Sequence, residues 1–212
     1  MSNIQIIHGD CMEAMAKMPD KAFELAIVDP PYGIGNFVPQ NISKNGKCAG
    51  KEVYWNDEIP PSEYFRCLER ISLRQIIWGA NYYNCFNNNG GALVWHKGNI
   101  NPIFSQCEIA SLSFQKKIDY VFINWQSGFF RNNIETIVHP CQKPVALYQW
   151  LLKNYAKPGD KILDTHGGSC SLAIACDIMG FDAVIYEIDE DYYKAAVDRF
   201  ERHKQQTVLE FV

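Results

Sequence analysis

The sequence lacks the features of a membrane or exported protein. Its apolar runs are far shorter than the roughly 18 residues that a membrane-spanning helix needs. Its first residues, Met-Ser-Asn-Ile-Gln, contain neither the basic nor the apolar segment of a signal peptide. We therefore expect a cytoplasmic protein that does not associate with a membrane.

The cysteines show no metal-binding or disulfide pattern. The chain has 8 cysteines, but no two of them have the C-x-x-C spacing of a zinc or redox site. No group of Cys and His residues has zinc-ligand spacing either. In a chain without an export signal, we expect reduced thiols that fill core positions, and no metal.

A net positive charge is also missing. Lys and Arg together number 20 against 24 Asp and Glu, which gives a net charge of −4. This balance argues mildly against a nucleic-acid partner, because phosphate contacts favour basic surfaces. The distribution of the charges matters more than their sum, however. Lysines gather around residues 44–51, yet each one taken alone is explained by a solvated surface.

Short apolar runs of strand length recur along the chain and alternate with segments of helical spacing. The expected strands are 4–7, 25–28, 76–78, 92–95, 121–125, 162–164 and 184–187, and the expected helices are 11–18, 62–72, 144–155, 169–179 and 190–203. This alternation predicts an α/β fold in one domain, 1–212, with a seven-stranded, mostly parallel sheet and helices on both faces. Two irregular stretches, 36–57 and 98–139, are candidate substrate-recognition insertions, because long irregular loops in compact domains are usually functional.

The most specific motif is Asp29-Pro30-Pro31-Tyr32, which directly follows the predicted strand 25–28. Ligands of open α/β sheets bind just beyond the carboxyl ends of strands. The two prolines make the backbone stiff and remove two N–H donors. A turn with a capping Asp would explain Asp-Pro alone, but the full tetrapeptide at a strand end indicates a catalytic loop.

This loop suits chemistry on an amino group that is conjugated to a base ring. Such a nitrogen is a poor nucleophile because its lone pair is delocalised. Acceptance of its two N–H bonds by Asp29 and by the Pro30 carbonyl would favour a pyramidal nitrogen that can attack a methyl sulfonium. Tyr32 would stack on the base. A base inside a duplex must be flipped out to reach such a site.

A second motif has the pattern of a nucleotide-binding loop. Asp164 ends a predicted strand and is followed by Thr-His-Gly-Gly-Ser and a helix, and glycine lets the backbone approach a ligand closely. Glu187 ends the next strand, close to the roughly 20 residues expected before a ribose-binding carboxylate. A nicotinamide cofactor fits less well, because the chain has no G-x-G-x-x-G and that reading leaves Asp29-Pro30-Pro31-Tyr32 unexplained.

A third motif, His139-Pro140-Cys141-Gln142-Lys143-Pro144, precedes a predicted helix. Lys143 would pair with a carboxylate, such as that of the cofactor's methionine portion, or else be a solvent lysine at a helix start. The Pro-Cys-Gln triplet resembles the nucleophile loop of cytosine C5-methyltransferases. In that family the glycine loop comes first and the Pro-Cys loop second, which is the reverse of the order here. We therefore interpret the triplet as a coincidence.

Together these motifs make the sequence similar to the β-class (permuted) amino-methyltransferases, a group with small phage-type and solitary members. The resemblance runs from residue 4 to about 203 and rests on Gly9-Asp10, 29–35, 139–144, 164–171 and Glu187. It implies a Rossmann-like fold, S-adenosylmethionine as cofactor and a flipped adenine in DNA as substrate. The cofactor-binding residues that we expect are Asp10, Asp29, His139, Lys143, Asp164, His166, Gly167, Gly168, Ser169 and Glu187.

One position departs from the family pattern. The family loop reads Phe-x-Gly-x-Gly, whereas this chain has His166-x-Gly168-x-Cys170. If the last position needs a positive φ, a cysteine there costs about 1–2 kcal/mol, and the affinity for the cofactor would suffer.

The leading hypothesis is a DNA adenine-N6 methyltransferase, because Asp rather than Ser at position 29 favours adenine in the family. The same chemistry on cytosine N4 or on RNA stays open, as does a catalytically silent DNA-binding homologue. Methylation of a protein glutamine fits less well, because those enzymes have Asn at this position. Dimerisation is common in the class, so a homodimer is a further expectation.

Overall fold

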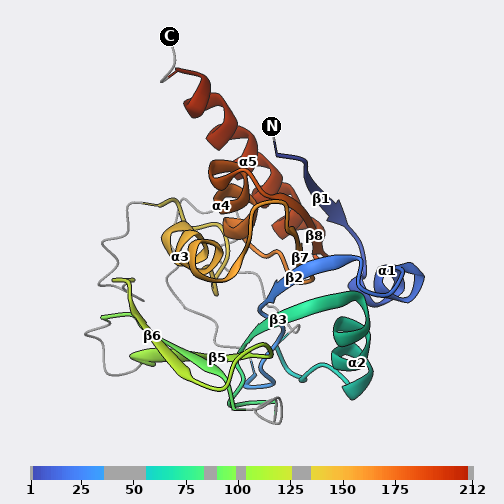
Figure 1. The fold of residues 1–212 in the computed structure, drawn as a ribbon. Helices are drawn as coiled ribbons and strands as arrows, with labels where there is room; N and C mark the ends of the chain where they lie inside the picture. Colours follow the sequence, from blue (N-terminus) through green and yellow to red (C-terminus); the bar gives the residue numbers. More distant parts are fainter. Residues whose placement is uncertain (1, 36–55, 84–89, 99–103, 126–134, 210–212) are drawn as a thin grey trace.

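The computed structural model describes residues 2–35, 56–83, 90–98, 104–125 and 135–209, and the side chains as far as residue 206. Within these residues, eight strands form one sheet and five helices cover it (Figure 1). The strands are β1 (Ile4–His8), β2 (Phe23–Val28), β3 (Ser72–Trp78), β4 (Ala92–His96), β5 (Cys107–Leu112), β6 (Ile118–Phe122), β7 (Lys161–Asp164) and β8 (Asp182–Glu187). The helices are α1 (Cys11–Lys17), α2 (Ser62–Ile71), α3 (Val145–Tyr155), α4 (Ser171–Met179) and α5 (Glu190–Leu209).

The strand order is β1-β8-β7-β2-β3-β5-β4-β6. The first five strands in this order are parallel to one another, so their carboxyl ends lie at the same edge of the sheet. β5 runs antiparallel to its neighbours β3 and β4, which puts its first residues at this same edge. β2 and β7 are far apart in the sequence but adjacent in the sheet, with Leu25 opposite Ile162. The two main motifs therefore lie side by side.

Alternation along the strands explains why helices cover both faces. In β2, Leu25 and Ile27 join the core with α3, α4 and α5, whereas Ala26 and Val28 join the core with α1 and α2. Successive side chains of a strand point to opposite faces, so a strand buried on both sides is apolar throughout. Figure 1 shows the same two layers, with α1 and α2 on one side of the central strands and α3, α4 and α5 on the other.

The mostly parallel α/β fold is confirmed, but the prediction of seven strands is wrong. β5 lies inside the stretch 98–139, which the sequence analysis assigned to an insertion with one strand. It begins with exposed and half-exposed residues, so its apolar signal is short. β6 was expected at 121–125 but begins at Ile118. Ile118, Tyr120 and Phe122 are 68%, 62% and 57% exposed, so the strand alternates at the sheet edge and is not a continuous apolar run.

Two other features complete the fold. None of the described helices is long and apolar enough to cross a membrane. The six cysteines in the described part of the chain are free thiols, but only Cys170 and Cys176 are buried. The expectation that the cysteines fill core positions therefore holds for these two residues alone among the described ones.

Candidate active site

The carboxyl ends of adjacent parallel strands bring most of the expected site residues to one edge of the sheet. Asp10 follows β1, Glu187 ends β8, Asp164 ends β7 and Asp29 follows β2. His8 of β1 lies opposite Glu187 in the parallel pairing. The sequence separates these acids widely, and the strand order alone brings them together.

The glycine loop between β7 and α4 is anchored to the end of β8. The N–H of Gly168 donates a 2.7 Å hydrogen bond to Oε2 of Glu187, and the N–H of Gly167 donates one of 2.7 Å to the carbonyl of Tyr186. A Cβ at Gly167 would lie 2.6 Å from Cγ2 of Ile185. The close approach therefore requires glycine at position 167.

His139 covers this loop from the opposite side. A Cβ at Gly168 would lie 3.3 Å from Nδ1 of His139, and the His139 ring also packs edge-on against Tyr192, with centroids 4.4 Å apart. Burial and then the charge of Lys143 lower the pKa of His139 to about 3. His139 is therefore a neutral side chain beside the glycine loop at physiological pH.

The loop residues between Asp164 and α4 are held by local hydrogen bonds. The N–H of His166 donates to Oδ1 of Asp164 at 2.9 Å, and Nδ1 of His166 lies 2.9 Å from the hydroxyl of Thr165. Burial lowers the pKa of His166 to about 4. The Ser169 hydroxyl lies 3.1 Å from the hydroxyl of Ser171.

Asp10 caps α1, because its Oδ1 accepts from the N–H of Met12 at 2.7 Å.

The acids at this edge are suited to a ligand with cationic groups and hydroxyls. Burial raises the pKa of Asp164 to about 7, and the charges of Asp29 and Glu187 contribute to the rise. Burial also raises the pKa of Glu187. A bound sulfonium or ammonium group would offset this mutual repulsion, and carboxylates accept hydrogen bonds from ribose hydroxyls. These groups therefore fit S-adenosylmethionine, which Glu187, Asp164 and the glycine loop would hold.

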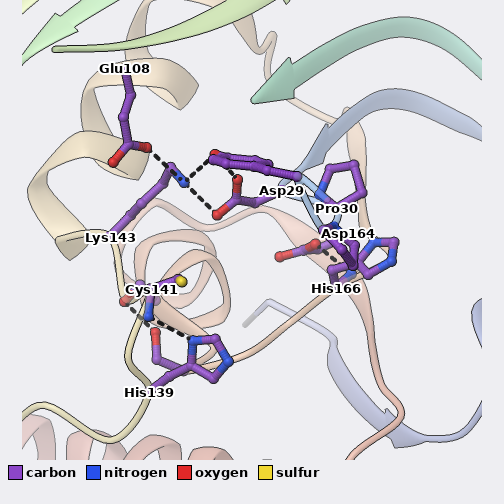
Figure 2. A network of polar contacts seen from close by, with 12 residues as sticks. Asp29, Pro30, Glu108, His139, Cys141, Lys143, Asp164 and His166 are labelled. Atoms are coloured by element: carbon purple, nitrogen blue, oxygen red, sulfur yellow. Dashed lines mark hydrogen bonds and ion pairs between the residues drawn. The ribbon is translucent and has the colours of Figure 1, made fainter. Parts of the chain in front are cut away.

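The predicted catalytic loop converges on one ion pair (Figure 2). Nζ of Lys143 pairs with Oδ2 of Asp29, and the Tyr32 hydroxyl donates to Oδ1 of Asp29 at 2.5 Å. Lys143 is 4% exposed and Asp29 is 16% exposed at their side chains. The alternative of a solvent lysine at a helix start is therefore wrong, and Lys143 is part of the site. Burial raises the pKa of Asp29 even though the Lys143 ammonium lowers it.

Aromatic residues after β3 support the same loop. A Cβ at Gly79, which has a φ of +74°, would lie 2.3 Å from the Tyr32 ring, so only glycine lets that ring pack there. Tyr82 stacks on Tyr32 with centroids 4.9 Å apart. The Tyr83 hydroxyl donates to the carbonyl of Pro30 at 2.5 Å and to that of Pro31 at 2.8 Å.

Glu108, the second residue of β5, was not among the site residues predicted from the sequence. Oε2 of Glu108 lies 3.1 Å from Nζ of Lys143, and Oε1 lies 2.8 Å from Nζ of Lys97. Figure 2 shows the Lys143 side chain between Glu108 and Asp29. A single acid at the start of a short apolar run was the only signal in the sequence, and it does not reveal which partner lies across the fold.

Two cysteines bear on the sequence hypotheses. Although Cys141 keeps an exposed surface, desolvation and the charges of Asp29 and Glu108 raise the pKa of its thiol to about 12. Such a thiol is a poor nucleophile, which agrees with interpreting Pro-Cys-Gln as a coincidence. Cys170 has a φ of +53° and is fully buried. The positive φ that was the condition for strain at this position is therefore present. A lower affinity for the cofactor as a result of this strain stays a prediction.

The two candidate insertions are described only in part. Residues 36–55, with the lysine cluster around 44–51, lie outside the described residues, as do 99–103 and 126–134. From the described remainder of 36–57, Asn56 reaches the catalytic loop, because its Oδ1 accepts from the N–H of Tyr32 at 2.7 Å. The described part of 98–139 contributes β5, β6 and Glu108.

Comparisons with known proteins relate this chain to DNA methylases. Residues 114–198 match a family model described as DNA methylase. The putative methylase YubD of Escherichia coli is 25% identical over 210 residues, which cover 92% of this chain and 89% of YubD. Among solved structures, the M1.HpyAVI–SAM complex has a TM-score of 0.57 and 20% identity, and covers 92% of this chain and 99% of that one. PvuII DNA methyltransferase, described as cytosine-N4-specific, has a TM-score of 0.64 and 12% identity, and covers 97% and 91%.

The fold is shared with DNA methyltransferases of known structure, including M1.HpyAVI in its complex with SAM. The buried acids and the glycine loop fit S-adenosylmethionine, which M1.HpyAVI binds in its solved complex. Part of the chain, residues 114–198, matches the DNA methylase family model, and the relatives and solved structures that resemble it over most of its length are methylases or DNA methyltransferases.

Proposed function

We propose that this protein is a DNA methyltransferase that transfers a methyl group from S-adenosylmethionine to N6 of adenine. The observation that carries the proposal is the buried Asp29 carboxylate, which is held beside the Pro30 carbonyl by Lys143, Tyr32 and Tyr83. These two oxygens are the acceptors that an exocyclic amino group needs. Asp at the first position of the loop favours adenine.

The residues of the loop would act by position and charge. S-adenosylmethionine supplies an electrophilic methyl group on a sulfonium. Asp29 and the Pro30 carbonyl would accept the two N–H bonds of the target amino group, which localises the lone pair on nitrogen. Acceptors fixed before the reaction need no reorganisation, and Lys143 and Tyr83 supply that fixation.

Tyr32 would hold the target base. Its ring already stacks on Tyr82, which is 40% exposed, so an aromatic surface lies open to solvent beside the catalytic loop. Stacking on an aromatic side chain is worth about 1–3 kcal/mol per base. A base in a duplex reaches these rings only after it is flipped out. Flipping and a homodimer remain predictions from the family resemblance.

Methylation of cytosine N4 is the second candidate. It is favoured by the likeness of the fold to the cytosine-N4-specific PvuII enzyme over 97% of this chain. Both bases present an exocyclic amino group to the same two acceptors, so the chemistry of the loop serves either one.

Base-resolved mapping of the product separates the two candidates. The purified protein is incubated with S-adenosylmethionine carrying a labelled methyl group and with DNA free of methylated bases, and the nucleosides are then identified. The proposal expects labelled N6-methyladenine. Labelled N4-methylcytosine would replace the proposal by the second candidate, and the absence of transfer to DNA would refute both. A parallel reaction with RNA tests that substrate.

A further inference from the structure

Four buried or partly buried charges of alternating sign extend from the end of β4 to the catalytic loop. In order they are Lys97, Glu108, Lys143 and Asp29, which come from four separate segments of the chain. Their side chains are 9%, 23%, 4% and 16% exposed. Charges buried to this degree are retained only when they are paired, because an uncompensated buried charge costs several kcal/mol.

Lys143 is the hub of this chain, because its ammonium forms ion pairs with both carboxylates. An ammonium group has three N–H donors. Three oxygens surround Nζ of Lys143: Oδ2 of Asp29, Oε2 of Glu108 at 3.1 Å and the Tyr32 hydroxyl at 3.3 Å. The Trp78 ring lies on a further side, with Nζ 5.2 Å from its centroid. These contacts fix the ammonium in space, and Glu108 is the one oxygen partner that lies outside the catalytic loop.

Glu108 is itself held on its other side. Oε1 of Glu108 lies 2.8 Å from Nζ of Lys97, and the backbone of Lys97 is tied to Gln106 and Trp125 by hydrogen bonds of 2.8 and 2.7 Å. Glu108 lies opposite Trp95 in the antiparallel pairing of β4 and β5. Oε1 of Glu108 therefore contacts Lys97, which directly follows β4, and Oε2 contacts Lys143, which precedes α3.

We propose that Glu108 is a positioning residue that acts on Asp29 through Lys143. Anchored by Lys97, it divides the Lys143 ammonium between two carboxylates, so that Asp29 is oriented by the lysine without having its whole charge neutralised. A carboxylate that keeps part of its charge is the better acceptor for an amino N–H. This inference rests on the proposed function, in which Asp29 accepts from the target amino group.

The charged groups around Asp29 determine its titration. Lys143 stabilises the ionised form, and the Tyr32 hydroxyl donates to it. Glu108 opposes ionisation by like charge, and Asp164 at the end of β7 repels Asp29 as well. The thiol of Cys141 also interacts with Asp29 but is neutral at physiological pH. Without the Glu108 charge, the Lys143 ammonium pairs with Asp29 alone, so the pKa of Asp29 must fall.

The test compares the wild type with Glu108→Gln, which preserves shape and removes one charge. Asp20→Asn is the matched control, because Asp20 pairs with Arg70 outside the site and its side chain is 75% exposed. The first readout is the pH profile of single-turnover methyl transfer to DNA at saturating cofactor, counted for all bases together. The second readout needs no activity: it is a 13C NMR titration of aspartate-labelled full-length protein, in which the Asp29 signal is assigned by its loss in Asp29→Asn.

For Glu108→Gln we expect the acid limb of the rate profile and the NMR midpoint of Asp29 to move together by about one pH unit toward lower pH. The maximal rate should fall about ten-fold while the Kd for S-adenosylmethionine stays within two-fold. Asp20→Asn should match the wild type in every readout. An unshifted Asp29 midpoint in Glu108→Gln would overturn the inference, as would a loss of rate with an unshifted acid limb. If the wild type methylates cytosine, the adenine proposal fails, but the pH profile of the rate and the NMR midpoint of Asp29 still test the role of Glu108.

Discussion

Replacement of Asp164 by Asn should stabilise the protein, and the gain should grow with pH. Asp164 is 3% exposed, and burial raises its pKa from 3.8 to about 7. Since the folded value is the higher one, folding disfavours the ionised carboxylate. The cost begins as the pH rises through the unfolded value and levels off above the folded value. At about 1.36 kcal/mol per pH unit, the cost is about 1.5 kcal/mol at pH 5 and about 4 kcal/mol at pH 8.

The assay is urea unfolding of the wild type and Asp164→Asn at pH 5 and pH 8 without cofactor. The asparagine oxygen can still accept from the N–H of His166, which donates to Oδ1 at 2.9 Å, and pH-independent effects of the substitution cancel between the two pH values. The stability advantage of Asp164→Asn should therefore be about 2.5 kcal/mol larger at pH 8. The control Asp20→Asn, which replaces an exposed acid, should show no such increase in its stability relative to the wild type at pH 8. An equal advantage at both pH values would refute the claim that the site keeps Asp164 at a cost in stability.

Three further substitutions test the geometry of the site. Gly79→Ala should reduce the methyl-transfer rate by about 10- to 100-fold in a protein whose circular dichroism spectrum is native, because the new Cβ would lie 2.3 Å from the Tyr32 ring; an unchanged rate would contradict this packing. Tyr83→Phe, which removes the donor to the Pro30 carbonyl, should lower the rate about ten-fold without weakening cofactor binding measured by calorimetry, whereas equal losses in both would indicate a general structural role. Cys170→Gly should be more stable than Cys170→Ala in thermal unfolding by about 0.5–1 kcal/mol, because the φ of +53° strains any side chain; the reverse order would mean that the strain is absent.

The sequence was sufficient for the parts of the site that follow strand ends. Asp29 and Asp164 stand at the ends of apolar strands of the parallel sheet, and neighbouring parallel strands end at the same edge. Local patterning therefore located the catalytic loop and the glycine loop, and it predicted α1 to α4 to within two residues, while α5 extends to Leu209, beyond the predicted end at 203. These features depend on short-range periodicity and on glycine and proline chemistry, which a single sequence displays.

The contacts between segments could not be predicted in this way. Lys143 pairs with Asp29 from 114 residues away, and neither the burial of the lysine nor its second partner, Glu108, is visible in local spacing. β5 was missed because its polar start weakens the apolar pattern, and its antiparallel direction is a property of the sheet and not of the segment. The network that orients Asp29 is thus a product of tertiary structure.

The central claim is that the Asp29 carboxylate carries the methyl-transfer chemistry. Its most direct test is single-turnover transfer from labelled S-adenosylmethionine to DNA by Asp29→Ala, with cofactor affinity measured on the same preparation by calorimetry. The account predicts that transfer is abolished while cofactor binding stays largely intact. Transfer at the wild-type rate by Asp29→Ala would contradict it.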